Sequence, residues 1–170
     1  MRAVSDFSEL GALGFVAVGV VVVLLVLRRW ADALFFVAGV GVVWVVNPLL
    51  KELVGRPRPD LLQLPASTSE YSFPSGHAAN TAALVGSLVL ILPSLRTRVF
   101  CAVVGAAVLM LVGLSQLELG RHHPSDLLAG WLWAGAWIGL VAWIRSRWRA
   151  SWRDRWRARR LGPRPDADRT

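Results

Sequence analysis

The sequence is short of several residue types, and each shortage excludes something. It has one cysteine, Cys101, so a single chain forms no internal disulfide and no cysteine-based metal site. Charged residues make up only 18% of the 170 residues, against roughly 25% in ordinary soluble domains. Lys51 is the only lysine among 19 basic residues. The low charge, with 55% hydrophobic residues, favours a membrane protein.

Five apolar runs without Asp, Glu, Lys or Arg account for most of the hydrophobicity. Each is long enough, or nearly so, to cross a hydrocarbon core. We therefore predict an all-α polytopic membrane helix bundle with about five transmembrane helices: Leu10–Leu27, Ala33–Leu50, Ala78–Leu95, Val99–Leu114 and Leu127–Ile144. Gly135 and Gly139 in the last span form a small-residue pair typical of close helix contact.

Basic residues are distributed unequally between the two sides of this bundle. Fourteen of the 19 lie between spans one and two, between spans three and four, or after span five. By the positive-inside rule this side is cytoplasmic. We expect a multi-pass protein of the cell membrane, with a cytoplasmic C-terminus and with the loops 51–77 and 115–126 on the extracytoplasmic side.

The composition divides the chain into a membrane domain, 1–144, an Arg/Trp-rich segment, 145–161, and an end segment, 162–170, that we predict to be disordered. In 145–161, tryptophan recurs every four residues among arginines, which predicts an amphipathic juxtamembrane helix on anionic lipids. The net charge of +8 would also suit nucleic acid, but the adjacent membrane argues against that partner. A scaffold that recruits proteins through this segment is an alternative function.

Polar chemistry is concentrated in the two extracytoplasmic loops. They hold all three histidines and four of the five basic residues on that side, which favours an anionic ligand there. In the first loop, Ser75 can cap a helix and Gly76 lets a ligand approach the free N–H groups at its start. His77 adds a group that exchanges protons near neutral pH. A capped helix with an incidental histidine is the alternative.

In the second loop, His122 and Asp126 are four residues apart. If the turn is helical they share a face, and Asp126 can accept one imidazole N–H, which leaves the other ring nitrogen nucleophilic. A simple polar helix cap is the alternative. The pair His122–His123 also suggests zinc, but neighbours on a helix point apart and only one further histidine exists, so we predict no metal site.

Taken together, three blocks of residues resemble the type-2 phosphatidic acid phosphatases, the membrane branch of the superfamily that includes vanadium haloperoxidases. That family carries K-x6-R-P, P-S-G-H and S-R-x5-H-x3-D. Here the blocks read Lys51…Arg58-Pro59, Pro74-Ser75-Gly76-His77 and Ser115-Gln116…His122…Asp126. The resemblance covers about residues 33–144.

The resemblance implies a lipid phosphatase with its active site at the extracytoplasmic helix ends. His122 would attack phosphorus to form a phosphohistidine, Asp126 would orient it, and His77 would protonate the leaving group. The phosphate oxygens would be held by Lys51, Arg58, Ser75, the Gly76 N–H, Gln116 and Arg121. No cofactor is implied. The substrate could be a phosphatidate, phosphatidylglycerol phosphate or polyprenyl phosphate, and the sequence indicates no oligomeric state.

One position departs from the family pattern, because Gln116 stands where the family has arginine. Loss of a charged, bidentate phosphate clamp costs ~2–3 kcal/mol, or roughly 10²-fold in rate. Arg121 or Arg56 is a candidate replacement. The alternative function is a weakened or inactive module that binds or transports lipid phosphates. The apolar residues of the first loop, Leu61, Leu62, Leu64, Tyr71 and Phe73, suggest an interfacial flap, or simple loop packing.

Overall fold

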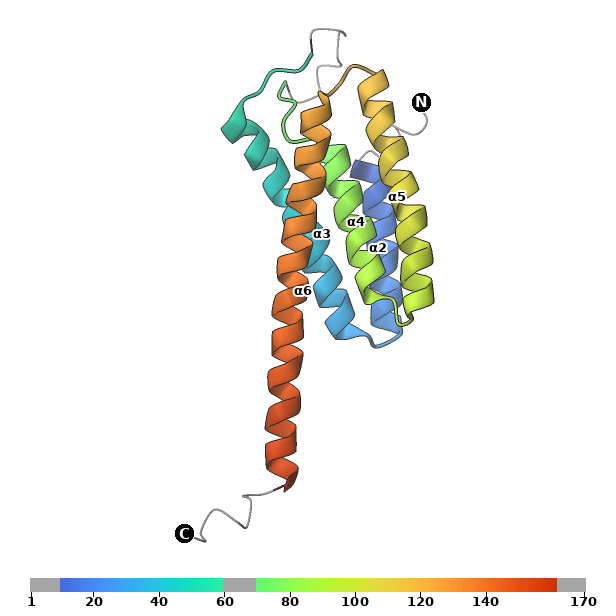
Figure 1. Ribbon diagram of the computed structural model, residues 1–170, viewed down its shortest axis with the longest axis vertical. Helices are drawn as coiled ribbons and strands as arrows, with labels where there is room; N and C mark the ends of the chain where they lie inside the picture. Colours follow the sequence, from blue (N-terminus) through green and yellow to red (C-terminus); the bar gives the residue numbers. More distant parts are fainter. Residues whose placement is uncertain (1–9, 60–69, 162–170) are drawn as a thin grey trace.

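The computed structural model describes residues 10–59 and 70–161, with side chains up to Arg153. These residues form five α-helices: α2 (Leu10–Val26), α3 (Trp30–Val54), α4 (Gly76–Ile91), α5 (Leu95–Glu118) and α6 (Pro124–Leu161). The helices lie roughly side by side (Figure 1), and the predicted all-α membrane bundle is confirmed. The leucines suggested as a flap lie outside the described residues.

Three of these helices are long and apolar enough to cross a membrane: Trp30–Val54, Leu95–Glu118 and the Pro124–Arg153 part of α6. The other two, α2 and α4, are apolar but shorter, with 17 and 16 residues. A 16-residue helix is ~24 Å long, less than the ~30 Å of a hydrocarbon core. In Figure 1 the start of α4 lies below the adjoining ends of α3, α5 and α6. The first turn of α4 is therefore recessed within the bundle.

The predicted spans were too short at the ends that carry the polar residues, whereas the predicted span Ala78–Leu95 ran too far, since α4 ends at Ile91 and Leu95 begins α5. Helix α3 continues past Leu50 to Val54 and stops at Gly55, whose φ of 61° suits a left-handed helix cap. Helix α5 runs on to Glu118. Lys51 and Gln116 therefore lie on helices rather than in loops. Hydrophobicity marks the part of a helix that contacts lipid, whereas backbone hydrogen bonding continues until a residue such as Gly55 ends it.

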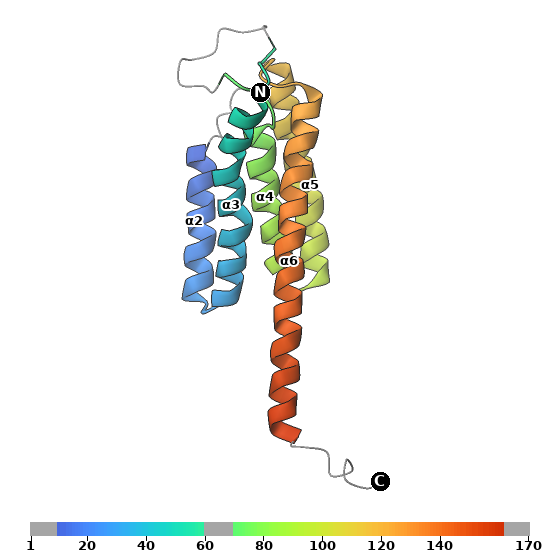
Figure 2. The same ribbon diagram turned by 90° about the vertical axis from the view of Figure 1, so that its left-hand side faces the viewer.

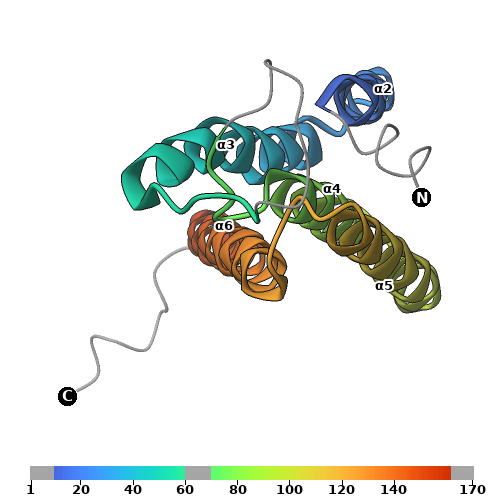
Figure 3. The same cartoon turned by 90° about the horizontal axis from the view of Figure 1, so that it is seen from above.

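Helix α4 is the centre of the bundle. It packs against each of the other four helices, and seen from above it lies among α3, α5 and α6 (Figure 3). Its buried face carries small residues such as Ala79 and Ala83, which meet Phe36 and Val43 of α3 and Ile138 of α6 in one apolar cluster. Small side chains let neighbouring backbones approach closely.

The Arg/Trp-rich segment 145–161 is not a separate helix, because α6 continues through it without a break. At 38 residues, α6 is ~57 Å long, and Figure 2 shows its last turns extending beyond the other helices. The contact of this segment with anionic lipids stays a prediction. The predicted disorder of 162–170 concerns residues outside the described part.

Close packing of α6 on α4 depends on Gly130. A Cβ atom there would lie 2.8 Å from the Ser75 carbonyl oxygen and 3.1 Å from the Ala79 amide nitrogen. These are backbone atoms, so they cannot rotate away. By contrast, a Cβ at Gly135 or Gly139 meets nothing within 4 Å. The pair predicted to mark a helix contact therefore faces no other helix within the described residues.

We expect Gly130→Ala to lower the thermal stability of the purified protein, at a cost of ~1–3 kcal/mol, because overpacking must separate α6 from the start of α4. Gly135→Ala on the same helix is the control and should be neutral or slightly stabilising, because alanine favours a helix. Thermal unfolding in one detergent compares the two. Equal melting temperatures for both variants would contradict the packing described here.

Candidate active site

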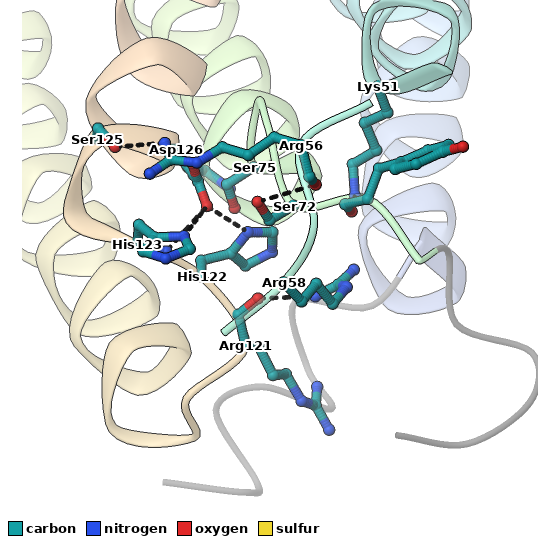
Figure 4. Close-up of polar contacts among 12 residues, drawn as sticks. Lys51, Arg56, Arg58, Ser72, Ser75, Arg121, His122, His123, Ser125 and Asp126 are labelled. Carbon is teal, nitrogen blue, oxygen red and sulfur yellow. Dashed lines mark hydrogen bonds and ion pairs between the residues drawn. The ribbon is translucent and has the colours of Figure 1, made fainter. Parts of the chain in front are cut away.

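The residues of the three sequence blocks come together at one end of the bundle. They lie at the end of α3, the start of α4, the end of α5 and the start of α6 (Figure 4). An isolated β-bridge between Pro57 and Tyr71 and a 2.8 Å hydrogen bond from the Ser72 N–H to the Arg56 carbonyl hold the two described ends of the α3–α4 connection together. The first block is thereby fixed beside the other two.

Asp126 is positioned by the start of α6. Pro124 is the first helical residue, and Asp126, two positions on, accepts the His123 backbone N–H at 2.9 Å. This is the reciprocal half of a capping box. The turn from His122 to Asp126 is not helical throughout, because His122 precedes the first residue of α6. The pair still meets: His122 Nδ1 lies 3.5 Å from Asp126 Oδ2.

The Arg56 guanidinium, in the first loop, also binds the Asp126 carboxylate. Arg56 Nη1 donates to Asp126 Oδ1 at 2.9 Å and to Ser125 Oγ at 2.7 Å (Figure 4). Asp126 is fully buried, and a buried carboxylate needs such a partner. Arg56 is therefore engaged by Asp126, which speaks against its use as the replacement phosphate clamp.

His122 is buried, with 4% of its surface exposed. Burial lowers the pKa of its imidazole below the ordinary 6.5, because desolvation penalises the charged form. The hydrogen bond to Asp126 raises that pKa, and the charges of Arg58 and Lys51 lower it again. His122 is thus neutral near pH 7. With Nδ1 directed at Asp126, the opposite nitrogen, Nε2, is the one available to react.

Three cations surround the two histidines that are candidate catalytic residues. Lys51 Nζ, in the last turn of α3, is 3.4 Å from the Tyr71 carbonyl oxygen. Arg58 Nη1 donates to the Arg121 carbonyl oxygen at 2.9 Å. The charges of Lys51, Arg58 and Arg121 all act on His77. This cluster favours an anion between the end of α3 and the start of α4.

The start of α4 carries the predicted cap. Ser75 is the N-cap, its hydroxyl accepts the Ala78 N–H at 3.4 Å, and its own N–H donates to the Asp126 carbonyl oxygen at 3.0 Å. The last bond ties the second block to the third. Gly76 follows as the first helical residue, where N–H groups have no partner within the helix and can bind an anion.

Gln116 is fully buried in the last turn of α5. The backbone carbonyl oxygen of Gln116 accepts the Arg121 backbone N–H at 3.1 Å, so this residue supports the loop that carries His122. A side chain without exposed surface presents nothing to a ligand in this conformation. Its predicted role in substrate binding stays a prediction, as do the roles given to the other site residues.

Sequence reasoning missed two contributors. It weighed Arg56 only as a phosphate ligand and not as the partner of Asp126. It did not single out Ser72, which is fully buried and donates to the Pro57 carbonyl oxygen at 3.0 Å. Nothing in the sequence distinguishes Ser72 from an ordinary loop serine. The proximity of Arg56 to Asp126 depends on a fold that brings residues 70 positions apart together.

Comparison with known proteins shows the family of this chain. The model of the PAP2 superfamily matches residues 30–150. The chain is 31% identical over 137 residues to phosphatidylglycerophosphatase B of Bacillus subtilis, which covers 76% of this chain and 67% of that protein. It is also 31% identical over 143 residues to decaprenylphosphoryl-5-phosphoribose phosphatase of Mycobacterium tuberculosis, with 82% and 75% covered. The chain belongs to the PAP2 superfamily.

A solved structure shares the fold as well. The crystal structure of a transmembrane PAP2-type phosphatidylglycerolphosphate phosphatase from Bacillus subtilis matches with a TM-score of 0.74 and 27% identity, over 86% of this chain and 75% of that one. Other relatives are longer, since the chain spans 46% and 49% of two lipid A 1-phosphatases. The match supports a transmembrane phosphatase bundle.

The imidazole of His122 should titrate below pH 6.5, because its environment lowers its pKa. Asp126→Asn should lower the midpoint further, since the carboxylate stabilises the imidazolium. NMR titration of the histidine-labelled protein, with the signal assigned through His122→Gln, measures both values. A midpoint at or above 6.5 in the unmodified chain would show that His122 is not desolvated in this way.

Proposed function

We propose that this chain is an integral membrane lipid phosphatase that hydrolyses a phosphomonoester or pyrophosphate of a lipid. The observation that carries the proposal is the buried His122–Asp126 pair beside Lys51, Arg58 and the recessed start of α4. Phosphoryl transfer requires positioning and neutralisation of charge, and fixed cations with a helix N-terminus supply both. The names of the relatives point to the same class of reaction.

In the proposed reaction, the Nε2 lone pair of His122 attacks phosphorus. A P–N bond forms and the bond from phosphorus to the leaving oxygen breaks, which leaves a phosphohistidine. Asp126 holds the ring through Nδ1 and balances the charge that develops on it. Lys51, Arg58 and the Gly76 N–H stabilise the equatorial oxygens, as preorganised donors do in such transition states.

His77 completes the cycle in this proposal. In its protonated form, which the negative charge of a bound phosphate would favour, it gives a proton to the leaving oxygen. It then takes one from the water that attacks the phosphohistidine, so that phosphate is released and His122 returns to its starting state. The chemistry uses only side chains and a helix start, so we propose that phosphate release resists EDTA and is inhibited by vanadate, which resembles the five-coordinate phosphorus of the transition state.

The position of the site supports a lipid substrate. It lies at the end of a bundle whose outer surface is apolar, so an acyl or prenyl chain can remain among the helices while its phosphate meets the polar cluster. We propose that this end is extracytoplasmic, because the opposite end carries most of the basic residues. Phosphate release from phosphatidate, phosphatidylglycerol phosphate and polyprenyl phosphates identifies the substrate.

His122→Ala should abolish phosphate release from the preferred lipid, because in the proposed reaction His122 is the group that forms the P–N bond. His123→Ala is the matched control. It removes a ring whose Nδ1 also lies 3.5 Å from Asp126 Oδ2, but the backbone N–H that binds Asp126 remains, and most activity should survive. A colorimetric phosphate assay on purified protein in mixed micelles measures both. Equal activity in His122→Ala and the unmodified chain would rule out the phosphohistidine.

Gln116 favours a second candidate function, a lipid-phosphate binding or transport module with little turnover. We expect Gln116→Arg to raise the rate by up to ~10²-fold if the missing cation limits catalysis. Gln116→Met, similar in size but without charge, controls for repacking of this buried position. If the unmodified chain has no detectable turnover and the variant does, the binding module is favoured. If the unmodified chain already turns over and the variant is faster, a weakened enzyme is favoured. No rise would mean that Arg121 or another cation already fills the role.

A further inference from the structure

Two adjoining cavities lie at the end of the bundle opposite the candidate active site. One, of about 670 Å³, runs between α3 and α6 and is lined mainly by apolar side chains such as Leu34, Ala38 and Val141. The other, of about 400 Å³, reaches the turn between α4 and α5. Phe35, Arg145 and Arg149 line both, so the two spaces meet at these residues.

The smaller cavity is strongly cationic. Its lining includes four arginines, Arg29, Arg98, Arg145 and Arg149, and a single carboxylate, Asp32, for a formal charge of +3. Asp32 contacts three of them: Arg29 at 2.6 Å, Arg149 at 3.5 Å, and Arg145. One carboxylate cannot neutralise three guanidinium groups. An anion in this cavity would supply the missing charge.

Part of that charge also has a structural use. Arg29 donates to the Ile91 carbonyl oxygen, and Arg98 Nε donates to the Leu92 carbonyl oxygen at 2.7 Å. These carbonyl groups end α4, where cations are stabilising. Each guanidinium has five N–H donors, so donors remain on both side chains, and Arg149 is more than half exposed.

The depth of the cluster matches the opposite membrane boundary. Along α6, Arg145 is 21 residues from Pro124, or ~32 Å at the rise of a helix, close to the ~30 Å of a hydrocarbon core. Trp30 and Trp148 line the rim of the larger cavity and are more than half exposed. Tryptophan at this level is typical of the boundary between lipid and water.

We propose that these cavities bind one anionic phospholipid from the leaflet on this side of the membrane. Its phosphate lies among Arg98, Arg145 and Arg149, and one acyl chain follows the groove lined by Leu34, Ala38 and Val141. Charge selects the headgroup, and the groove, whose Leu34 wall is 72% exposed, is open to the acyl chains of the bilayer. Basic pockets between transmembrane helices bind such headgroups in other membrane proteins.

This site differs from the predicted surface contact of the 145–161 segment, since it is built between helices, and it does not rest on the proposed phosphatase activity. Phosphatidylglycerol is the probe, because it is anionic but carries no terminal phosphate to hydrolyse. The purified full chain is mixed with equal amounts of phosphatidylglycerol and phosphatidylcholine that have the same acyl chains. Native mass spectrometry should then show one phosphatidylglycerol molecule retained per protein.

The double variant with Arg98→Gln and Arg149→Gln should bind phosphatidylglycerol about 30-fold more weakly. Each basic residue contributes roughly 1 kcal/mol to such binding, and a factor of ten in affinity corresponds to about 1.4 kcal/mol. The pair Arg96→Gln and Arg147→Gln is the matched control: it removes the same charge from the same two helices, and neither residue lines the cavities. Control binding should stay within a factor of three.

Equal losses in both pairs would mean diffuse attraction to the basic end and would overturn the proposal. Displacement of the lipid by millimolar inorganic phosphate would show a site for free phosphate instead. A lipid-free dimer would show that a second copy covers the groove.

Ala38→Phe tests the acyl groove: it should weaken phosphatidylglycerol binding at least tenfold, whereas Ala106→Phe on the exposed face of α5 should not. Unchanged binding in Ala38→Phe would remove the acyl part of the assignment.

Discussion

The buried carboxylate of Asp126 is the interaction on which the candidate site depends. It ties together three segments that are distant in the sequence: the Arg56 guanidinium, the His123 backbone and the His122 imidazole. The backbone carbonyl oxygen of Asp126 accepts the Ser75 N–H and so connects α6 to the start of α4. A charge that has lost water must be matched by close partners. The same requirement that stabilises this end of the bundle therefore also orients the histidine.

The packing of α6 and α3 against α4 supports that arrangement. Gly130 lets the first turns of α6 lie directly on the first turn of α4, and the small residues of α4 let α3 approach from the other side. The residues of the candidate site are thereby held on helix ends, and on the connections joined to them, that are packed against one another. Function in this fold, as we propose it, uses short polar caps on an apolar scaffold, because a hydrocarbon environment tolerates polar groups only at the ends or in enclosed pairs.

How far the sequence could predict this structure differs between features. The membrane bundle followed from five uncharged runs, and the grouping of Lys51, His77 and His122 followed from their blocks, because both signals are local. The helix ends did not follow: polar residues such as Lys51 continue a helix as well as apolar ones do. The pairing of Arg56 with Asp126 was also beyond reach, since it joins the first loop to the first turn of α6 and is made only after folding. The cationic cavity around Asp32 gathers residues from four segments and leaves no pattern along the chain.

The shortness of α4 sets the depth at which a reaction can occur. This helix begins below the ends of its neighbours (Figure 1). In the proposed reaction the phosphate would therefore be bound beneath the surrounding lipid headgroups. The helix is ~6 Å shorter than the hydrocarbon core, which gives the scale of that depth. An amphiphile already anchored in the bilayer reaches that level by sideways diffusion. A water-soluble phosphate ester would have to enter the protein from water and lose its hydration shell. In the proposed reaction, this depth would favour amphiphiles over soluble metabolites without any pocket shaped for the rest of the molecule.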